Sequence, residues 1–228
     1  MRTLAIGDIH GCHTALSRLI REVRLDAQDR LIFLGDYIDR GPGSRAVLER
    51  LLCLQGECSA VFLRGNHEVM ILESRDDPLK ANLWQSYGGL DTLRSYNAES
   101  REDWCSAIPD SHWRLLERTR PCFETSTALF VHACVDPDLN LNNQPDRFLY
   151  WEFFDGIQPH KSGKRIICGH TPQRSGLIKN LGFAVCIDTG PASGGWLTCL
   201  DTDSGQYWQA DEKGGARTGR LADDALKP

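Results

Sequence analysis

The first third of the chain alternates short apolar runs with amphipathic segments. The apolar runs predict buried strands over residues 3–8, 30–36 and 60–65, and the segments between them predict helices over 13–25 and 44–54. Each run is apolar at consecutive positions, which is typical of strands covered on both faces of a parallel sheet. Strand, helix and strand in repetition therefore predict a parallel sheet with right-handed crossovers.

The middle of the chain, from about residue 67 to 120, has a different pattern. It is rich in helix formers and in Trp and Tyr, and no run in it predicts a strand. We expect a helical insert here, interrupted near Pro78, at Gly88-Gly89 and near Pro109.

Strand signals return in the second half. They cover residues 128–132, 165–169, 184–188, 196–201 and 206–209, and the short spacing of the last three predicts antiparallel hairpins. From Asp211 the chain is polar and contains Gly, so we expect a frayed end. The predicted fold class is α/β, with two packed mixed β-sheets flanked by helices. It forms a single domain over 1–210, with a helical insert at about 67–120 and a polar C-terminal tail over 211–228.

Composition narrows the class of protein. The 228 residues carry a formal net charge of −5, which argues against a nucleic-acid partner but leaves room for a local positive pocket. The nine cysteines contain no Cys-x-x-Cys pair and indicate free thiols in a reducing compartment. No signal peptide and no membrane-length apolar window is evident, so we expect a cytoplasmic protein without a membrane partner.

Polar motifs follow the predicted strands. They read Gly7-Asp8-Ile9-His10-Gly11, Gly35-Asp36-Tyr37-Ile38-Asp39-Arg40-Gly41, Arg64-Gly65-Asn66-His67-Glu68, Val131-His132 and Gly169-His170. The carboxyl ends of strands in open α/β sheets are where ligand sites gather. Carboxylate, imidazole and amide donors without thiolates suit Mn²⁺, Fe or Zn²⁺ in a reactive site.

The spacing of these donors predicts two metal ions. Asp8 and His10 are two residues apart, so both can face one ion. Asp36 can bridge two ions through its two oxygens, and the second ion can be completed by Asn66, His132 and His170. With Arg40 and Arg64 nearby, the site has the positive charge that a phosphate dianion requires, and two such ions can activate water for an in-line displacement.

The ordered motifs resemble the phosphoprotein phosphatase family, the metal-dependent serine/threonine phosphatases, and within it the compact bacterial and phage members of the calcineurin-like metallophosphoesterases. The match runs from Thr3 to about Asp201. The resemblance implies the sandwich fold of those enzymes and two divalent ions, with Mn²⁺ the expected activator in vitro and Fe or Zn²⁺ as alternatives. One ion would be held by Asp8, His10 and Asp36, and the other by Asp36, Asn66, His132 and His170.

The resemblance also implies how the reaction proceeds. A hydroxide that bridges the ions would attack phosphorus, and His67 would protonate the leaving alkoxide while Asp39 holds it. Arg40 and Arg64 would clamp the phosphoryl oxygens. The implied substrate is a phosphorylated protein or peptide. Its phosphorylated residue would be phosphoserine or phosphothreonine, with phosphotyrosine as an alternative.

Two alternatives stay open. Diadenosine tetraphosphate hydrolases share the first and third motifs, but usually have Ala where this chain has Asp39, so Asp39 favours phosphomonoesters. An inactive phosphoprotein-binding module would be expected to lack a ligand or the acid, and none is lost here.

Three features depart from the family pattern or lie close to the predicted ligands. The family usually has another phosphate-binding Arg near residues 150–153, where this chain has Glu152 followed by two Phe; Arg147 or Arg174 are candidates to replace it. Trp84 and Tyr87 share one predicted helix that could rim the cleft. The cysteines two positions from a ligand are interpreted as packing residues rather than redox groups; they are Cys12, Cys134 and Cys168.

Overall fold

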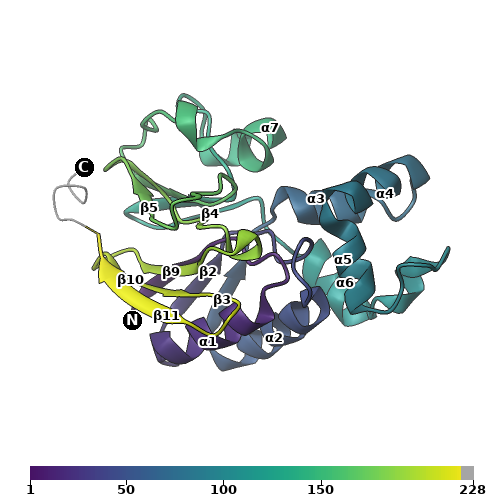
Figure 1. Cartoon of the computed structure of the whole chain (residues 1–228). Helices are drawn as coiled ribbons and strands as arrows, with labels where there is room; N and C mark the ends of the chain where they lie inside the picture. The colour runs from purple at the N-terminus through teal and green to yellow at the C-terminus, as the bar shows by residue number, and fades with distance from the viewer. Residues whose placement is uncertain (222–228) are drawn as a thin grey trace.

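In the computed structural model, which describes residues 1–221, two β-sheets lie face to face (Figure 1). Within those residues the first sheet has six strands in the order β11 (Ala216–Arg220), β10 (Gln206–Ala210), β9 (Leu197–Asp201), β1 (Thr3–Ile6), β2 (Arg30–Phe33) and β3 (Ser59–Phe62). The second has five in the order β4 (Cys122–Glu124), β5 (Ala128–Val131), β6 (Arg165–Cys168), β8 (Ala184–Cys186) and β7 (Lys179–Asn180). The predicted class, two mixed sheets flanked by helices, is confirmed.

The middle of each sheet is parallel. β1, β2 and β3 run in one direction in the first sheet, and β5, β6 and β8 do so in the second. The strands added at the sides pair antiparallel, as β9 does with β1 and β4 with β5. Parallel neighbours end at one edge of a sheet, so the loops that follow them are brought together there.

The side chains of the central strands explain the layers. In β2, Leu31 and Phe33 pack into the cluster that includes helices α1 (His13–Val23) and α2 (Ser44–Glu57), whereas Ile32 packs between the sheets. Successive residues of a strand point to opposite faces, so a strand covered on both faces is apolar throughout. The core between the sheets contains Phe130 and Val185, both fully buried.

The outer face of the second sheet has its own cluster. It includes Leu129 and Ile166 from the strands and Leu149 from α7 (Asp146–Tyr150). The order of layers is therefore helices, sheet, sheet and a thinner cover of α7 with irregular chain (Figure 1).

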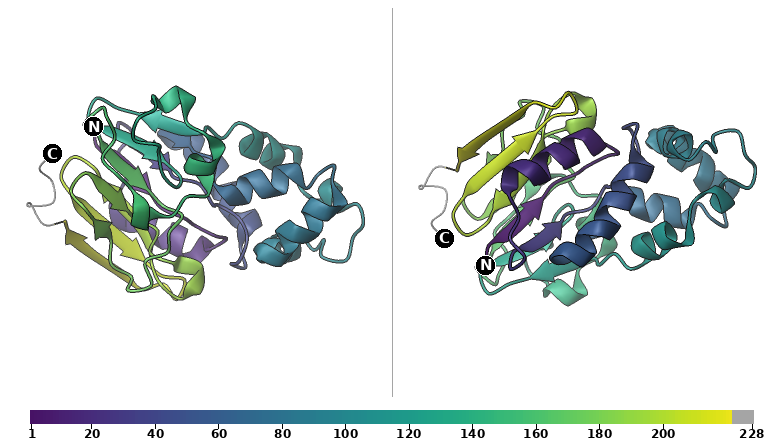
Figure 2. Two further views of the ribbon diagram at one scale, coloured as in Figure 1. Left: turned by 90° about the horizontal axis from the view of Figure 1, so that it is seen from above. Right: turned by 90° about the horizontal axis from the view of Figure 1, so that it is seen from below.

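The helical segment lies at one end of the sandwich (Figure 2). It consists of α3 (Asn66–Glu73), α4 (Pro78–Trp84), η1 (Gln85–Gly89), α5 (Leu90–Ser95), η2 (Trp104–Ala107) and α6 (Asp110–Glu117), which confirms the predicted helical insert. The predicted interruptions also occur, because Pro78 starts α4, Pro109 precedes α6, and Gly88 has a non-helical φ of 112°. Of the described helices, none has the length and apolar character to cross a membrane.

Two expectations about the strands are wrong. The strand at 184–188 was expected to form a hairpin with the next one, but β8 and β9 belong to different sheets; of the three strands expected in hairpins, β9 and β10 pair in this way. The short strands β4 and β7 were not predicted. Each is two or three residues long at the side of a sheet, too short for a hydrophobic period to register.

The tail expected to fray from Asp211 instead begins with a paired strand. β11 runs antiparallel to β10, from Gln206 opposite Arg220 to Ala210 opposite Ala216. The Asp211 carboxylate closes the turn by accepting the Gly215 N–H at 2.7 Å. The sequence of β11 is polar and includes a Gly, so its pairing depends on the backbone and leaves no apolar pattern to detect. The remainder of the predicted tail, 222–228, lies outside the described residues.

The core between the sheets provides a stability test. Replacing the fully buried Phe130 by Ala removes a ring that both sheets contact, and should lower the free energy of unfolding by about 3–5 kcal/mol. Urea unfolding followed by circular dichroism measures the change. Leu177→Ala is the control, because Leu177 is exposed and should change stability by less than about 0.5 kcal/mol. Similar losses in both variants would contradict the assigned core.

Candidate metal centre

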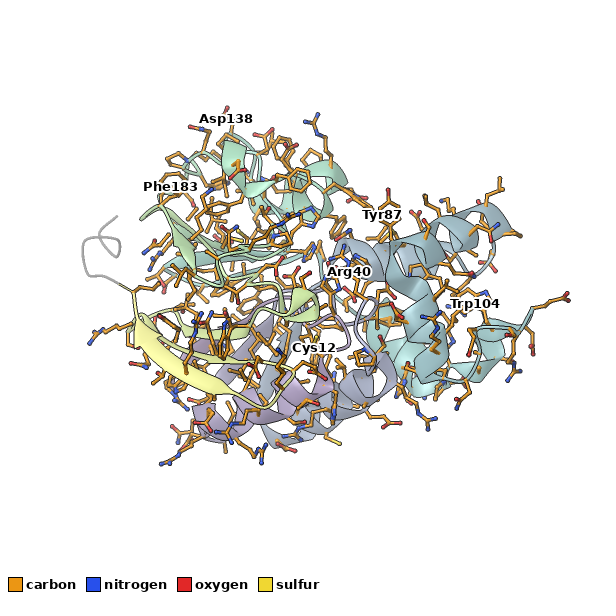
Figure 3. The ribbon with its side chains drawn as sticks, viewed as in Figure 1. Cys12, Arg40, Tyr87, Trp104, Asp138 and Phe183 are labelled. Carbon is orange, nitrogen blue, oxygen red and sulfur yellow. The ribbon has the colours of Figure 1, made fainter. Side chains whose placement is uncertain are left out.

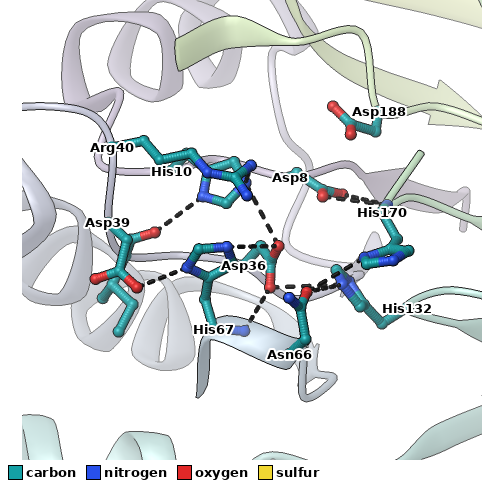
Figure 4. A network of polar contacts seen from close by, with 12 residues as sticks. Asp8, His10, Asp36, Asp39, Arg40, Asn66, His67, His132, His170 and Asp188 are labelled. Carbon is teal, nitrogen blue, oxygen red and sulfur yellow. Dashed lines mark hydrogen bonds and ion pairs between the residues drawn. The ribbon is translucent and has the colours of Figure 1, made fainter. Parts of the chain in front are cut away.

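Polar side chains follow six parallel strands at the edge where the two sheets meet the helical segment (Figures 3 and 4). The first sheet contributes, after β1, β2 and β3, the residues Asp8, His10, Asp36, Asp39, Arg40, Asn66 and His67. The second contributes, after β5, β6 and β8, the residues His132, His170 and Asp188. The six predicted metal ligands are thus brought to one place.

Asp36 lies at the middle of the group and is 2% exposed. Its Oδ2 is 3.4 Å from His10 Nε2 and 3.9 Å from His67 Nε2, and its Oδ1 is 3.5 Å from His132 Nε2. Burial alone would raise the pKa of Asp36, but the surrounding histidines outweigh it and lower that pKa. Two triads of close donor atoms share this carboxylate: His10, Asp36 and His67, and Asp36, His132 and His170.

The second triad leaves its lone pairs free and directed inward. His132 Nδ1 is 3.0 Å from the Leu34 carbonyl, so it carries the ring proton and Nε2 is an acceptor. Asn66 Oδ1 lies 3.0 Å from that nitrogen and 3.2 Å from His170 Nδ1. Burial lowers the pKa of His132, and burial with the adjacent His132 lowers that of His170 to about 4.

Acceptor atoms that face one another need either a proton donor or a cation between them. Turning the Asn66 amide would supply donors to Asp36, His132 and His170. A divalent cation meets the same need with the carbonyl oxygen directed inward, and neutral imidazole with carboxylate and amide oxygens is a metal-binding set. The residues present therefore fit the second predicted ion.

The first triad contains His67 in place of the expected Asp8. His10 Nδ1 is 3.0 Å from the Ile38 carbonyl, so Nε2 is the acceptor, and burial lowers the pKa of this histidine to about 3. Arg40 Nη1 donates to the same His10 Nε2 at 2.8 Å. The guanidinium and an ion at this position would compete for one lone pair, so Arg40 must turn away when an ion binds.

Asp8 lies beside the first triad with its carboxylate against the loop after β6. It accepts the His170 backbone N–H at 3.1 and 3.2 Å, and it is 1% exposed. A Cβ atom at Gly169 would come within 2.0 Å of Asp8 Oδ1, so the loop requires glycine there. Burial, together with Asp188 and Asp36, raises the pKa of Asp8 well above its usual range. Cations would relieve the mutual repulsion of these three buried carboxylates.

His67 is held by a second buried group. Its Nδ1 is 2.6 Å from Asp39 Oδ2, which also accepts the Trp84 indole N–H at 2.8 Å. The Thr92 hydroxyl donates to Asp39 Oδ1 at 2.6 Å. His67 Nε2 is buried and has no hydrogen-bond partner among the described residues. Burial works against protonation of His67, but Asp36 and the bond to Asp39 prevail and raise its pKa.

These side chains are aimed by an unusual backbone. A left-handed conformation occurs at non-glycine residues in the loops after β1, β2 and β6, namely His10, Asp36, Asp39, Arg40 and His170, with φ between 46° and 72°. The Glu68 carboxylate supports the loop after β2 and the loop after β3, accepting the N–H groups of Asp36 at 2.7 Å, Tyr37 at 2.9 Å and Gly65 at 2.9 Å. Glu68 lies in the first turn of α3, and its carboxylate also fixes the turn at Asp36.

The other predicted cations lie outside the cluster. Arg64 donates to the Thr119 hydroxyl at 2.9 Å and to the Glu117 carbonyl at 2.8 Å, which ties β3 to the end of α6. Arg147 pairs with Glu152 at 2.9 Å, and its side chain is 77% exposed. The structure thus brings Arg40, but not Arg64, into polar contact with the predicted ligands.

The three cysteines near the ligands are buried, and their Sγ atoms lie against backbone carbonyls. Burial raises the pKa of Cys12 and of Cys134 to about 12, and that of Cys168 well above its usual value. Protonated, enclosed thiols react poorly, which supports their interpretation as packing residues.

Three residues of the site were not assigned from the sequence. Thr92 and Trp84 bind Asp39 from the helical segment, and only Trp84 had been placed near the cleft. Asp188 follows β8; its Oδ1 accepts the Gly190 N–H at 3.0 Å, while Oδ2 is buried without a partner in the described chain. Burial raises the pKa of Asp188 to about 7. An Asp directly after a buried strand, as at Asp8 and Asp36, was the available signal.

Comparison with known proteins finds relatives that align over most of the chain. The chain is 34% identical over 214 residues to "Serine/threonine-protein phosphatase 1" of Salmonella typhimurium, covering 85% of this chain and 88% of that protein. It is 26% identical over 271 residues to "Bis(5'-nucleosyl)-tetraphosphatase, symmetrical" of Chromohalobacter salexigens, covering 91% and 97%.

Solved structures share the fold. A cold-active protein tyrosine phosphatase superposes with a TM-score of 0.69 and 17% identity over 100% of this chain and 80% of that one. A putative diadenosine tetraphosphatase gives a TM-score of 0.64 and 22% identity over 97% and 94%. The model of the calcineurin-like phosphoesterase family matches residues 1–182, and members of this family use a binuclear centre of divalent ions. The chain belongs to the calcineurin-like phosphoesterases and is a metallophosphoesterase hydrolase.

Proposed function

We propose that this hydrolase is a phosphomonoesterase that removes phosphate from phosphorylated proteins or peptides. The observation that carries the proposal is His67, whose Nδ1 is fixed by Asp39 at 2.6 Å and whose Nε2 is buried without a partner beside Asp36. A positioned acid matters most when the leaving group is an alkoxide, because an alkoxide is a far poorer leaving group than a phosphate. Seryl and threonyl phosphates have such leaving groups.

Different residues of the chain would hold the ions and transfer the proton. When two divalent ions are bound, they supply Lewis acidity and an activated water. Asp8, His10 and Asp36 would hold one ion, while Asn66, His132 and His170 would share Asp36 with the other. The His67 Nε2–H donates its proton to the oxygen that leaves phosphorus, and Asp39 stabilises the imidazolium form before that step.

Of the two predicted phosphate clamps, Arg40 has the better position. It lies within the cluster, and turning from His10 would direct its guanidinium at a phosphoryl group. Arg64 would first have to release its bonds to Thr119 and to the Glu117 carbonyl. We therefore assign phosphate binding to Arg40 and leave Arg64 as a secondary clamp.

A dinucleoside tetraphosphatase is the second candidate, favoured by the similarity to the Chromohalobacter protein over almost its whole length. Asp39 argues against it, since cleavage between phosphates releases a group that needs little protonation. Assaying the metal-loaded protein on phosphoserine, phosphothreonine and phosphotyrosine peptides beside diadenosine tetraphosphate decides between them. A higher kcat/KM for the dinucleotide than for every peptide would overturn the proposal.

Metal removal tests the ion centre, for which we propose Mn²⁺ as the activating ion in vitro. Exhaustive chelation should abolish hydrolysis. Without ions, the converging acceptor atoms of Asp36, Asn66 and His132 offer no positive charge to a phosphate and cannot activate a water molecule. Readdition of Mn²⁺ should restore it, with elemental analysis following two ions per chain. Hydrolysis that persists in metal-free protein would rule the centre out.

Replacing the acid should separate chemistry from metal binding. His67→Asn should retain two ions per chain but lose about 10²- to 10⁴-fold in kcat on phosphoserine peptides, with a smaller loss on an activated aryl phosphate. Asp36→Asn, by contrast, removes a charge from the shared ligand and should reduce metal occupancy itself. Equal losses of His67→Asn on both substrates would remove the general-acid role.

The support of Asp39 from the helical segment can be tested with matched variants. Trp84→Phe keeps the ring but deletes the N–H that lies 2.8 Å from Asp39 Oδ2, and should lower kcat about tenfold. Trp104→Phe is the control, because Trp104 packs on Trp84 with ring centroids 5.0 Å apart and, within residues 1–221, makes no hydrogen bond to the site. If both variants lose the same activity, packing rather than the hydrogen bond is responsible.

A further inference from the structure

One large apolar ring beside the metal centre is left open to solvent. Phe153 is 61% exposed, yet its ring stacks on the imidazole of His170 with centroids 5.5 Å apart and planes inclined by 29°. One face of the ring therefore covers a predicted metal ligand. The exposed part of the ring is available to pack against an apolar group of a ligand.

The chain around Phe153 is fixed. Its carbonyl accepts the Cys134 S–H at 3.5 Å, and the next residue, Phe154, is buried and donates its N–H to Thr171 Oγ1 at 2.9 Å. The exposed ring is thus held in place before any ligand arrives, which lowers the entropy cost of binding to it.

The position of the ring sets what it can contact. The Nδ1 atom of His170 faces Asn66 Oδ1 at 3.2 Å, in the second set of converging acceptors, so Phe153 is separated from that set by a single imidazole. The adjacent Glu152 is paired with Arg147, which reduces its repulsion of an approaching phosphate. A group bonded directly to a phosphate in the centre would lie beside this ring.

We propose that Phe153 is a specificity-determining residue that binds the aromatic ring of an aryl phosphate, with phosphotyrosine in a peptide as its substrate class. The inference rests on the proposed function and adds phosphotyrosine peptides to the seryl and threonyl phosphates for which His67 argues. The phenyl ring of phosphotyrosine is joined to phosphate through one oxygen and can stack on Phe153. A nucleobase is separated from its phosphate by a ribose, which carries the base beyond a ring this close to the centre. The side chains of phosphoserine and phosphothreonine present no flat face.

The test compares two peptides that differ only in phosphotyrosine or phosphoserine. Phe153→Leu keeps an apolar side chain but removes the aromatic face, and should lower kcat/KM for the phosphotyrosine peptide by about 2- to 12-fold while leaving the phosphoserine peptide unchanged. The loss should appear in KM rather than in kcat, since stacking acts on the ground and transition states alike. Trp151→Leu is the matched control, because Trp151 is an exposed aromatic residue of the same segment, whereas the ring stacked on His170 is that of Phe153.

A second measurement avoids any leaving group. Phenylphosphonate should inhibit the parent more strongly than methylphosphonate, and Phe153→Leu should reduce that ratio by the same factor. An unchanged ratio with unchanged peptide selectivity would overturn the inference while the phosphatase proposal stands. A fall in metal content of Phe153→Leu, with equal losses on both peptides, would show that the ring only shields His170, and would overturn it too. Absence of hydrolysis of every monoester by the metal-loaded parent would instead defeat the proposed function itself.

Discussion

The converging lone pairs around Asp36 are the constraint on which the rest of the structure depends. The Asp36 carboxylate, imidazole nitrogens at 3.4–3.5 Å and an amide oxygen nearby direct acceptor atoms toward one another. Such a group is stable in a protein only when cations occupy it or when surrounding donors hold each member in place. The second condition explains why the outer ring nitrogens of His10 and His132 lie against carbonyls, and why Glu68 collects the N–H groups of the Asp36 loop.

The fold meets this constraint by bringing two sheets to one edge. Neither sheet holds all the donors, since His132 and His170 come from the second and the others from the first. The layer of Ile32, Phe130 and Val185 between the sheets therefore fixes the distance between the two halves of the centre. The helical segment adds a different element, because Trp84 and Thr92 reach Asp39 from outside the sandwich. The position of Asp39 thus depends on the sandwich and on the helical segment that packs against it.

Much of this could be predicted from the sequence, for identifiable reasons. Strands buried on both faces are continuous apolar runs, and a polar residue soon after such a run is visible in the sequence. The six predicted ligands, and the paired His67 and Asp39, could therefore be named before the structure brought them together. β11 was missed because its sequence is polar and shows no apolar alternation, and β4 and β7 because they are too short. A sequence motif does not determine the direction in which a long side chain points either. Arg64 belongs to the third motif, but its guanidinium donates to the Glu117 carbonyl and to Thr119. These partners lie 53 and 55 residues away, and no local pattern specifies the contact.

The left-handed backbone of the ligand loops has a consequence for how the protein can change. Each non-glycine residue in this conformation costs roughly 1–2 kcal/mol, and His10, Asp36, Asp39, Arg40 and His170 all adopt it. The stability of the fold is only about 5–15 kcal/mol in a typical domain, so activity here consumes a sizeable part of that margin. Exchange of Arg40 for glycine would relax the chain while removing a functional side chain. Inactive descendants of this sequence would then tolerate more damage to their core than the active parent, and selection for thermal stability alone would favour the loss of catalysis.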